Sequence, residues 1–293
     1  MRNKVSCFGV GLHSGVRVDM TLHPSAEDTG ITFRRTDVDP DKSIISANYL
    51  NVTKTKLGTT IENEHGVSIS TIEHLMAALW GCGIDNCVID VNGPEIPIMD
   101  GSSEPFVFLI DCAGKKEQSK TRRIIEVLSE IRVAENDSPD SPFVAIAPSE
   151  GFSVDLEINF NDKVISKQDA SFDVNQYSFK NDISRARTFG FEHEVDYMRS
   201  IGLARGGSLE NAIVVGKEGI LNEDELRYNN EFVRHKILDC IGDVYLAGGY
   251  IKGHVYGYKS GHCLNNKLLR EFFADKNAWR IVQPPSCKEA PLL

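Results

Sequence analysis

The sequence lacks the features typical of membrane proteins and of secreted, disulfide-stabilised proteins. No stretch approaches about 18 uninterrupted apolar residues, and the first residues contain no apolar run of signal-peptide length. The 7 cysteines include no C-x-x-C pair, which disfavours a disulfide framework and a thiolate zinc finger. We therefore expect a protein without a transmembrane segment that resides in the reducing cytoplasm.

Positive charge is also scarce. The chain has 32 Lys and Arg against 42 Asp and Glu, a formal net charge of −10. This balance argues against a nucleic acid partner, because phosphates require a basic surface. It does not exclude a small anionic substrate, since a basic pocket can exist on an acidic protein. The 293 residues, 41% of them hydrophobic, suffice for one large domain or two of ordinary size.

Both halves of the chain have a similar order of predicted elements. Each contains a helix with a histidine in its N-terminal part, then a glycine turn and a strand, which hints at an internal duplication. The charged segment Lys115–Arg123 is either an interdomain linker or a solvated loop within one domain. Periodicity predicts strands at about 16–22, 86–91, 124–127, 143–148, 152–158 and 250–258, a hairpin over 59–69, and helices at about 71–80, 105–112, 231–247 and 265–274.

The helix predicted over 231–247 carries candidate metal ligands. His235, Asp239 and Asp243 follow one another at four-residue steps, which places them on one helical face. A His and an Asp four residues apart can both reach one metal ion. The same spacing also occurs in ordinary His–Asp pairs on a helix surface.

A second candidate pair, Glu73 and His74, lies at the start of the helix predicted over 71–80. With His235 and Asp239, His74 would complete the two-histidine, one-carboxylate set of a catalytic zinc site, which leaves a fourth position for water. Glu73 could then take a proton from that water. Alternatively, Ser70 and Glu73 have the spacing of a capping box, and His74 could be a partly buried structural histidine.

His262 lies in a glycine turn between a predicted strand and a predicted helix. From there it could face a cleft and protonate a leaving amine or stabilise negative charge. Asp243 could orient it, as a carboxylate does in a catalytic triad. The alternative is an ordinary loop histidine.

Seven motifs span nearly the whole chain: GVGLHSG at 9–15, STIEHL at 70–75, IPIMDGSS at 96–103, RTFG at 187–190, GGS at 206–208, NNEFVRHKILD at 229–239 and SGHCLN at 260–265. Together, and in this order, they resemble the UDP-3-O-acyl-N-acetylglucosamine deacetylases of lipid A biosynthesis. The resemblance implies hydrolysis of the acetamide of an acylated UDP-sugar with release of acetate. It also implies a monomer from a Gram-negative bacterium or an organelle derived from one.

For the fold, the resemblance implies a two-domain α+β protein, a β–α–α–β sandwich with the active site between the domains. We place these domains at 1–114 and 124–293, joined by a linker at 115–123. For the site, the resemblance implies one Zn²⁺, with Fe²⁺ as an alternative in the cell, bound by His74, His235 and Asp239. Glu73 would be the general base, and His262, supported by Asp243, the acid or electrostatic partner.

The resemblance also implies a substrate-binding region. Thr188 would bind the oxyanion, and Phe189 and Lys236 would contact the sugar and nucleotide. An insert at about 187–215 would form an apolar tunnel for the fatty acyl chain, although its mixture of glycines and apolar residues also suits an ordinary packed subdomain. The tunnel candidates are Val195, Ala204, Gly207 and Ser208. His13 could contact the substrate or only shape its glycine loop.

Two other functions compete with hydrolysis. A two-His, one-carboxylate set also suits Fe(II) oxygenases, and a non-catalytic protein could bind acylated nucleotide sugars. Glu73 and His262 favour a hydrolase, because they supply the base and the acid that hydrolysis needs.

Overall fold

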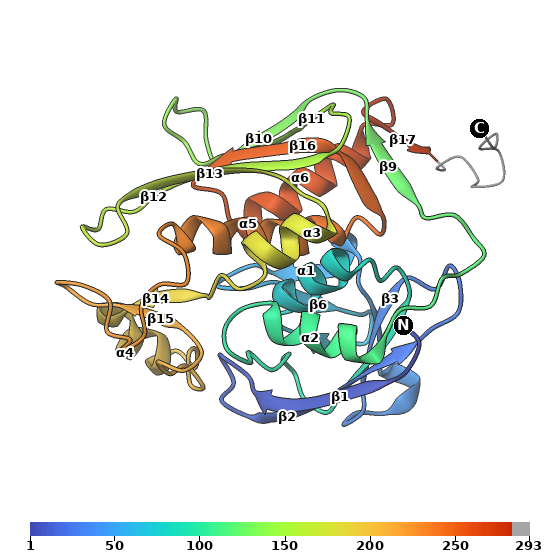
Figure 1. The fold of residues 1–293 in the computed structure, drawn as a ribbon, viewed down its shortest axis with the longest axis horizontal. Coiled ribbons are helices and arrows are strands. Elements are labelled where there is room, and N and C mark those ends of the chain that lie inside the picture. Colours follow the sequence, from blue (N-terminus) through green and yellow to red (C-terminus); the bar gives the residue numbers. More distant parts are fainter. Residues whose placement is uncertain (283–293) are drawn as a thin grey trace.

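The computed structural model describes residues 1–282 and has the layer order sheet, helices, helices, sheet (Figure 1). The described strands of the first half form a five-stranded sheet, β1-β2-β8-β3-β4, and those of the second half a seven-stranded sheet with central order β10-β11-β16-β12-β13. The helical layers lie between the two sheets. The predicted α+β class is therefore confirmed. Cys287 and the end of the predicted second domain lie outside the described residues.

The α-helices of residues 1–282 are α1 (Glu73–Cys82), α2 (Glu104–Ala113), α3 (Gln176–Ser178), α4 (Glu192–Ser200), α5 (Glu231–Tyr245) and α6 (His262–Ala274). The smaller of the two main sheets contains β1 (Val5–Val10), β2 (Arg17–Pro24), β3 (Ile31–Arg35), β4 (Ile44–Ser46) and β8 (Cys87–Val91). The larger contains β9 (Ile124–Val127), β10 (Ile131–Ala134), β11 (Phe143–Ala147), β12 (Phe152–Asn159), β13 (Lys167–Asp173), β16 (Tyr250–Tyr258) and β17 (Trp279–Val282). Small sheets are formed by β5 (Val52–Lys54), β6 (Thr60–Glu62) and β7 (Ser68–Ile69), and by β14 (Phe189–Phe191) and β15 (Ile213–Val215).

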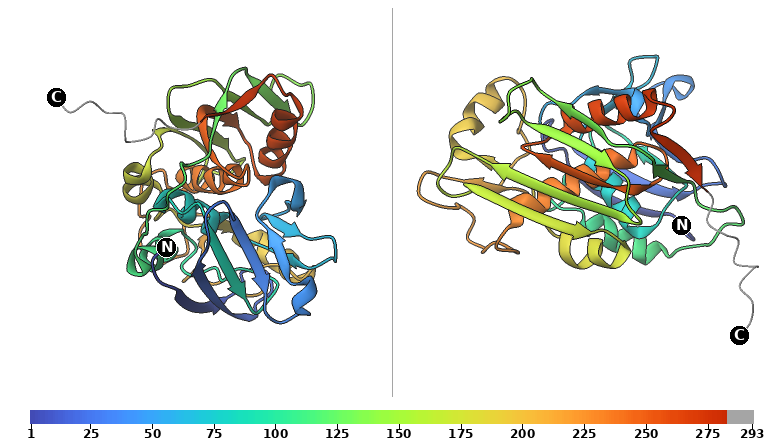
Figure 2. Two further views of the ribbon diagram at one scale, coloured as in Figure 1. Left: turned by 90° about the vertical axis from the view of Figure 1, so that its right-hand side faces the viewer. Right: turned by 90° about the horizontal axis from the view of Figure 1, so that it is seen from above.

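The main sheets each turn one face toward the helices. In β2 the buried side chains Val18, Met20 and Leu22 alternate with exposed Arg17 and Asp19, as a strand with one covered face requires. Strand β16 alternates half-buried with buried residues along its whole length. Seen from above in Figure 2, the strands of the larger sheet lie across α5 and α6. The apolar faces of both sheets therefore form the core with the central helices.

Helices α1 and α5 pack against each other at the centre of the molecule. The helix predicted over about 71–80 in fact continues to Cys82 and is ended by Gly83, whose φ is 73°. Gly81 serves packing: a Cβ there would overlap the ring of Phe179. Helix α6 begins at His262 rather than near Asn265, so His262 opens the helix instead of lying in the preceding turn.

The expected strands and hairpin agree with the structure to within about two residues, and β6 pairs with β7 antiparallel as the hairpin predicts. Residues 115–123 connect α2 with β9 as irregular chain. The domain boundaries at this segment stay a prediction. Within residues 1–282, no helix is long and apolar enough to cross a bilayer.

Candidate metal centre and active site

Helices α1 and α5 approach each other closely where Gly242 faces the start of α1. A Cβ at this position would collide with the backbone carbonyl of Glu73. The glycine lets the N-terminal turn of α1 lie against the middle of α5. As a result, His74 from one half of the chain meets His235 and Asp239 from the other.

His74, His235 and Asp239 form a buried group whose potential ligand atoms all lie within 4.8 Å of one another. The Nε2 atoms of His74 and His235 lie 3.5 and 3.4 Å from Oδ1 of Asp239. All three side chains are almost completely buried. The interpretation of His235 and Asp239 as a surface pair is therefore wrong.

The atoms of this group fit a divalent metal ion. Among residues 1–282, Asp239 Oδ1 and His74 Nδ1 are buried without a hydrogen-bond partner, which is costly for a protein interior. His235 Nδ1 lies 3.0 Å from the carbonyl oxygen of Ala186. Since a carbonyl only accepts, Nδ1 carries the proton and Nε2 keeps its lone pair, as in many metal sites. Burial lowers the pKa of His235 to about 3, so the ring is neutral, the form that binds metals.

Glu73 does not form the capping box that was the alternative to a catalytic role. It is the first residue of α1, and the structure, which describes this whole segment, shows no side-chain cap there. Ser70 Oγ instead donates to the carbonyl of Pro94. The Glu73 carboxylate points into the site, where Oε2 accepts a 2.9 Å hydrogen bond from the backbone N–H of Thr59. Burial raises the pKa of Glu73, which favours its holding a proton.

His262 and Asp243 form a buried pair next to Glu73. His262 Nδ1 lies 2.8 Å from Asp243 Oδ2, and its Nε2 lies 4.0 Å from Glu73 Oε1. Burial alone would lower the pKa of His262, but the Asp243 carboxylate outweighs it and raises this pKa to about 9. The raised pKa favours the protonated, cationic form of the ring.

Two further residues bind Asp243 that sequence reasoning missed. Asn265 Nδ2 donates to Asp243 Oδ2 at 2.8 Å, and Thr59 Oγ1 donates to Oδ1 at 2.5 Å. The spacing of Asn265, one turn after His262, could have suggested it. Thr59 left no comparable signal, because its contact is with a distant part of the chain.

Lys236 and Phe189 border the metal group. Lys236 Nζ lies 2.7 Å from Asp239 Oδ2. The ring of Phe189 meets that of His235 edge-on, with 6.2 Å between centroids, and packs on Phe232 at 5.0 Å. Thr188, half-buried, is fixed through its backbone, which donates to Gly101 O.

The backbone around Thr188 is held by the buried ion pair Arg187–Glu231. Arg187 Nε lies 2.8 Å from Glu231 Oε1, and the Arg187 backbone N–H donates to the same oxygen. Glu231 is the first residue of α5 and is fully buried. The pair therefore joins the start of α5 to the segment whose Ala186 carbonyl meets His235.

The insert at 187–215 lies at the edge of the molecule, as β14, β15 and α4 in Figure 1. All residues of α4 are half-buried or exposed, and Tyr197 is 63% exposed. Val195, Ala204 and Gly207 are half-buried and Ser208 is exposed. The structure thus brings Glu73, Lys236, Phe189, Asp243 and His262 to the metal group, whereas the four tunnel candidates lie in the peripheral insert.

His13 connects the insert with the loop between β5 and β6. Its Nδ1 accepts a 3.3 Å hydrogen bond from Ala204 N, and its Nε2 donates to Leu57 O at 3.0 Å. The neighbouring backbone adds bonds from Arg205 N to His13 O and from Gly206 N to Leu12 O. His13 therefore has a structural role, because it links its own loop to the insert and to Leu57.

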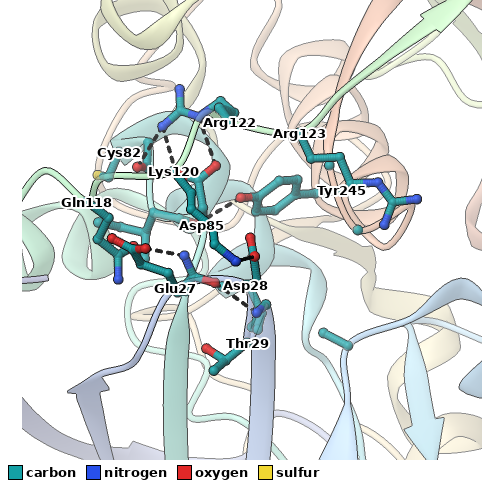
Figure 3. Close-up of a pocket in the computed structure, with 18 of the residues that line it drawn as sticks. Glu27, Asp28, Thr29, Cys82, Asp85, Gln118, Lys120, Arg122, Arg123 and Tyr245 are labelled. Atoms are coloured by element: carbon teal, nitrogen blue, oxygen red, sulfur yellow. Dashed lines mark hydrogen bonds and ion pairs between the residues drawn. The ribbon is translucent and has the colours of Figure 1, made fainter. Parts of the chain in front are cut away.

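A cavity of about 1030 Å³ lies away from the metal group, none of whose residues line it. It lies at the C-terminal ends of α1 and α5 under the charged segment 115–123 (Figure 3). There Arg122 binds Asp85 and the carbonyl of Gly83, and Lys120 pairs with Asp28. These cations are thus engaged in holding the segment to the body of the protein.

A comparison with known families agrees with the geometry. The model of the family described as UDP-3-O-acyl N-acetylglycosamine deacetylase matches residues 1–274. The match includes every residue of the metal group and its surroundings. A chain matched over this length, with a buried His–His–Asp group beside a carboxylate and a histidine, belongs to the UDP-3-O-acyl N-acetylglycosamine deacetylase family.

Proposed function

We propose that this deacetylase hydrolyses the acetamide of UDP-3-O-(3-hydroxyacyl)-N-acetylglucosamine in a metal-dependent reaction. The products are acetate and the free amine that enters lipid A synthesis. The family match supports the substrate class. The observation that carries the metal dependence is Asp239 Oδ1, which is buried without a hydrogen-bond partner among the described residues, although two imidazole nitrogens face it.

His74, His235 and Asp239 would hold the ion, which we propose to be Zn²⁺, with Fe²⁺ as an alternative. Bound there, the metal would act as a Lewis acid toward water and the amide carbonyl. Two neutral imidazoles and one carboxylate are the donor set of many catalytic zinc sites.

Glu73 is the proposed general base. One of its oxygens is occupied by the Thr59 N–H, whereas Oε1 faces His262 across 4.0 Å. Burial raises its pKa, so that it accepts a proton from the attacking water more readily than an exposed carboxylate would.

His262 is the proposed acid. Asp243 accepts from the Nδ1–H of His262, so the protonated ring carries its second proton on Nε2, which lies 4.0 Å from Glu73 Oε1 and 3.9 Å from Asp239 Oδ2. From this position it would donate a proton to the departing nitrogen or stabilise negative charge as the carbonyl is attacked.

The remaining residues would bind the substrate. We propose the Thr188 hydroxyl as an oxyanion donor, and Phe189 and Lys236 as contacts to the sugar and nucleotide. The exposed apolar residues of the insert, together with Val195, Ala204, Gly207 and Ser208, would bind the acyl chain. The exposed apolar residues are Tyr197, Ile201 and Leu209.

An assay for acetate release, with and without a chelator, tests the proposal. The hydrolase predicts release that the chelator abolishes and added Zn²⁺ restores. An Fe(II) oxygenase predicts oxygen consumption without acetate. A non-catalytic binder predicts neither product, only binding of the acylated UDP-sugar.

A further inference from the structure

Thr59 binds two carboxylates that come from different helices. Its backbone N–H donates to Glu73 Oε2 of α1 at 2.9 Å, and its hydroxyl donates to Asp243 Oδ1 of α5 at 2.5 Å. The same hydroxyl oxygen lies 3.2 Å from His262 Nδ1 of α6. Thr59 itself is 2% exposed. One residue thus touches the groups proposed as base and acid.

The donor directions in this network are fixed. A carboxylate at neutral pH only accepts, so the Thr59 hydroxyl proton points to Asp243. Its oxygen is then free to accept from the Nδ1–H of His262. Asp243 receives hydrogen bonds from Thr59 on Oδ1 and from His262 and Asn265 on Oδ2. These bonds prevent its carboxylate from turning.

The loop before Thr59 approaches Glu73 closely. A Cβ on Gly58 would lie 3.0 Å from Glu73 Oε1, so a side chain here would press on the carboxylate. Leu57, with a φ of 59°, turns the chain into this approach, and its carbonyl is bound by His13. The loop is therefore shaped to present the Thr59 N–H to Glu73.

We propose that Thr59 is a positioning residue, which holds Glu73 and the His262–Asp243 pair in one fixed arrangement. This inference rests on the proposed function, in which Glu73 and His262 act on the same amide. Without the hydroxyl, Asp243 Oδ1 would lose its donor, and His262 would lose one of the two groups that fix its ring. Without the N–H, Glu73 could rotate away from His262.

The variant Thr59→Val tests the hydroxyl, because it keeps the branched shape and the backbone N–H. We expect kcat to fall about 10- to 100-fold, the range of a hydrogen bond to a charged group. KM and metal content should stay unchanged, and Thr59→Ser should restore most of kcat. In a protein that already carries Asp243→Asn, Thr59→Val should lower kcat only slightly further, because the two residues act through one contact.

Thr71→Val is the matched control. The Thr71 hydroxyl also donates to a buried carboxylate, Glu95 Oε1, at 3.0 Å. Thr71→Val, which removes this hydroxyl, should lower the melting temperature about as much as Thr59→Val does. It should leave kcat within threefold of wild type. Equal losses of kcat in the two variants would overturn the positioning role, as would a Thr59→Val enzyme with normal kcat.

A second measurement needs neither metal nor turnover. In the metal-free protein, the imidazole N–H resonance of His262 reports its bond to Asp243. Thr59→Val should shift this resonance and Thr71→Val should not; an unchanged resonance would overturn the inference. Failure of the wild-type enzyme to release acetate would instead refute the proposed function, whatever the resonance shows.

Discussion

Glu73 and His262 are the first residues of two helices from opposite halves of the chain, and their carboxylate and imidazole lie 4.0 Å apart. This separation is too long for a hydrogen bond. Neither group is a hydrogen-bond partner of the other, although both are buried beside the metal group. With no hydrogen bond between them, both groups remain free to act on a third molecule bound beside the metal group.

Replacement of His235 by alanine should remove the metal and the activity but leave the fold intact. The ring supplies a ligand atom, whereas the helix around it is held by apolar core contacts. Elemental analysis should find about one metal ion per chain in the wild type and almost none in the variant. His23→Ala is the control, since His23 also pairs with an aspartate, Asp90, away from the site. Full metal content in inactive His235→Ala would remove His235 from the ligand set.

Replacement of Glu73 by glutamine should lower kcat by about 10²–10⁴, as the loss of a general base does. Glutamine still accepts the hydrogen bond from Thr59 N–H, so the melting temperature should change little. Ser70→Ala is the control, because the Ser70 hydroxyl binds Pro94 rather than the helix start. A Glu73→Gln enzyme with kcat within threefold of wild type would exclude Glu73 as the base.

His262 and Asp243 should behave as one unit. Each single alanine variant removes a charge that the remaining residue of the pair needs. The fall in kcat of the double variant should therefore be far smaller than the product of the falls in the two single variants. Steady-state kinetics of all four proteins measures this coupling. Strictly multiplicative losses would show that the two side chains act independently.

Breaking the Arg187–Glu231 pair should destabilise the protein strongly. Glu231→Gln leaves the Arg187 cation buried with a weaker partner, and removing one member of a buried pair costs about 3–5 kcal/mol. Urea unfolding measures this loss. The exposed pair Arg17–Asp19 gives the comparison, because Asp19→Asn should change stability by less than about 1 kcal/mol. A similar small loss for Glu231→Gln would contradict the structural role of the pair.

Gly207→Leu tests the insert as the acyl-binding segment. A Cβ at Gly207 has ordinary contacts, the nearest at 3.4 Å, so the fold should tolerate it. Because each buried methylene contributes about 0.8 kcal/mol, blocking the acyl site should lower kcat/KM for a long-chain substrate far more than for a truncated one. Gly151→Leu, where a side chain meets open space, should leave that ratio unchanged. An unchanged ratio in Gly207→Leu would place the acyl chain elsewhere.

The sequence predicted those parts of the site that repeat with helical spacing. His235, Asp239 and Asp243 lie on one buried face of α5, as their four-residue steps require. It could not predict which partners the tertiary structure would bring to Glu73. The Ser70 capping box failed because the helix begins at Glu73 itself, and the carboxylate turns to Thr59. Thr59 was missed because its bond to Asp243 joins residues far apart in the chain.

The close contact between the insert and the glycine loop at 9–15 limits how the two segments can vary in sequence. Gly206 lies so close to the loop that a side chain on it would collide with the carbonyl of Gly11, and a Cβ on Gly15 would lie 3.1 Å from that of Arg205. Each segment thus restricts which residues the other can carry at these contacts. Chimeras that exchange the insert between homologues should therefore be most stable and most active when residues 9–15 are exchanged with it. In evolution, the two segments are expected to change together.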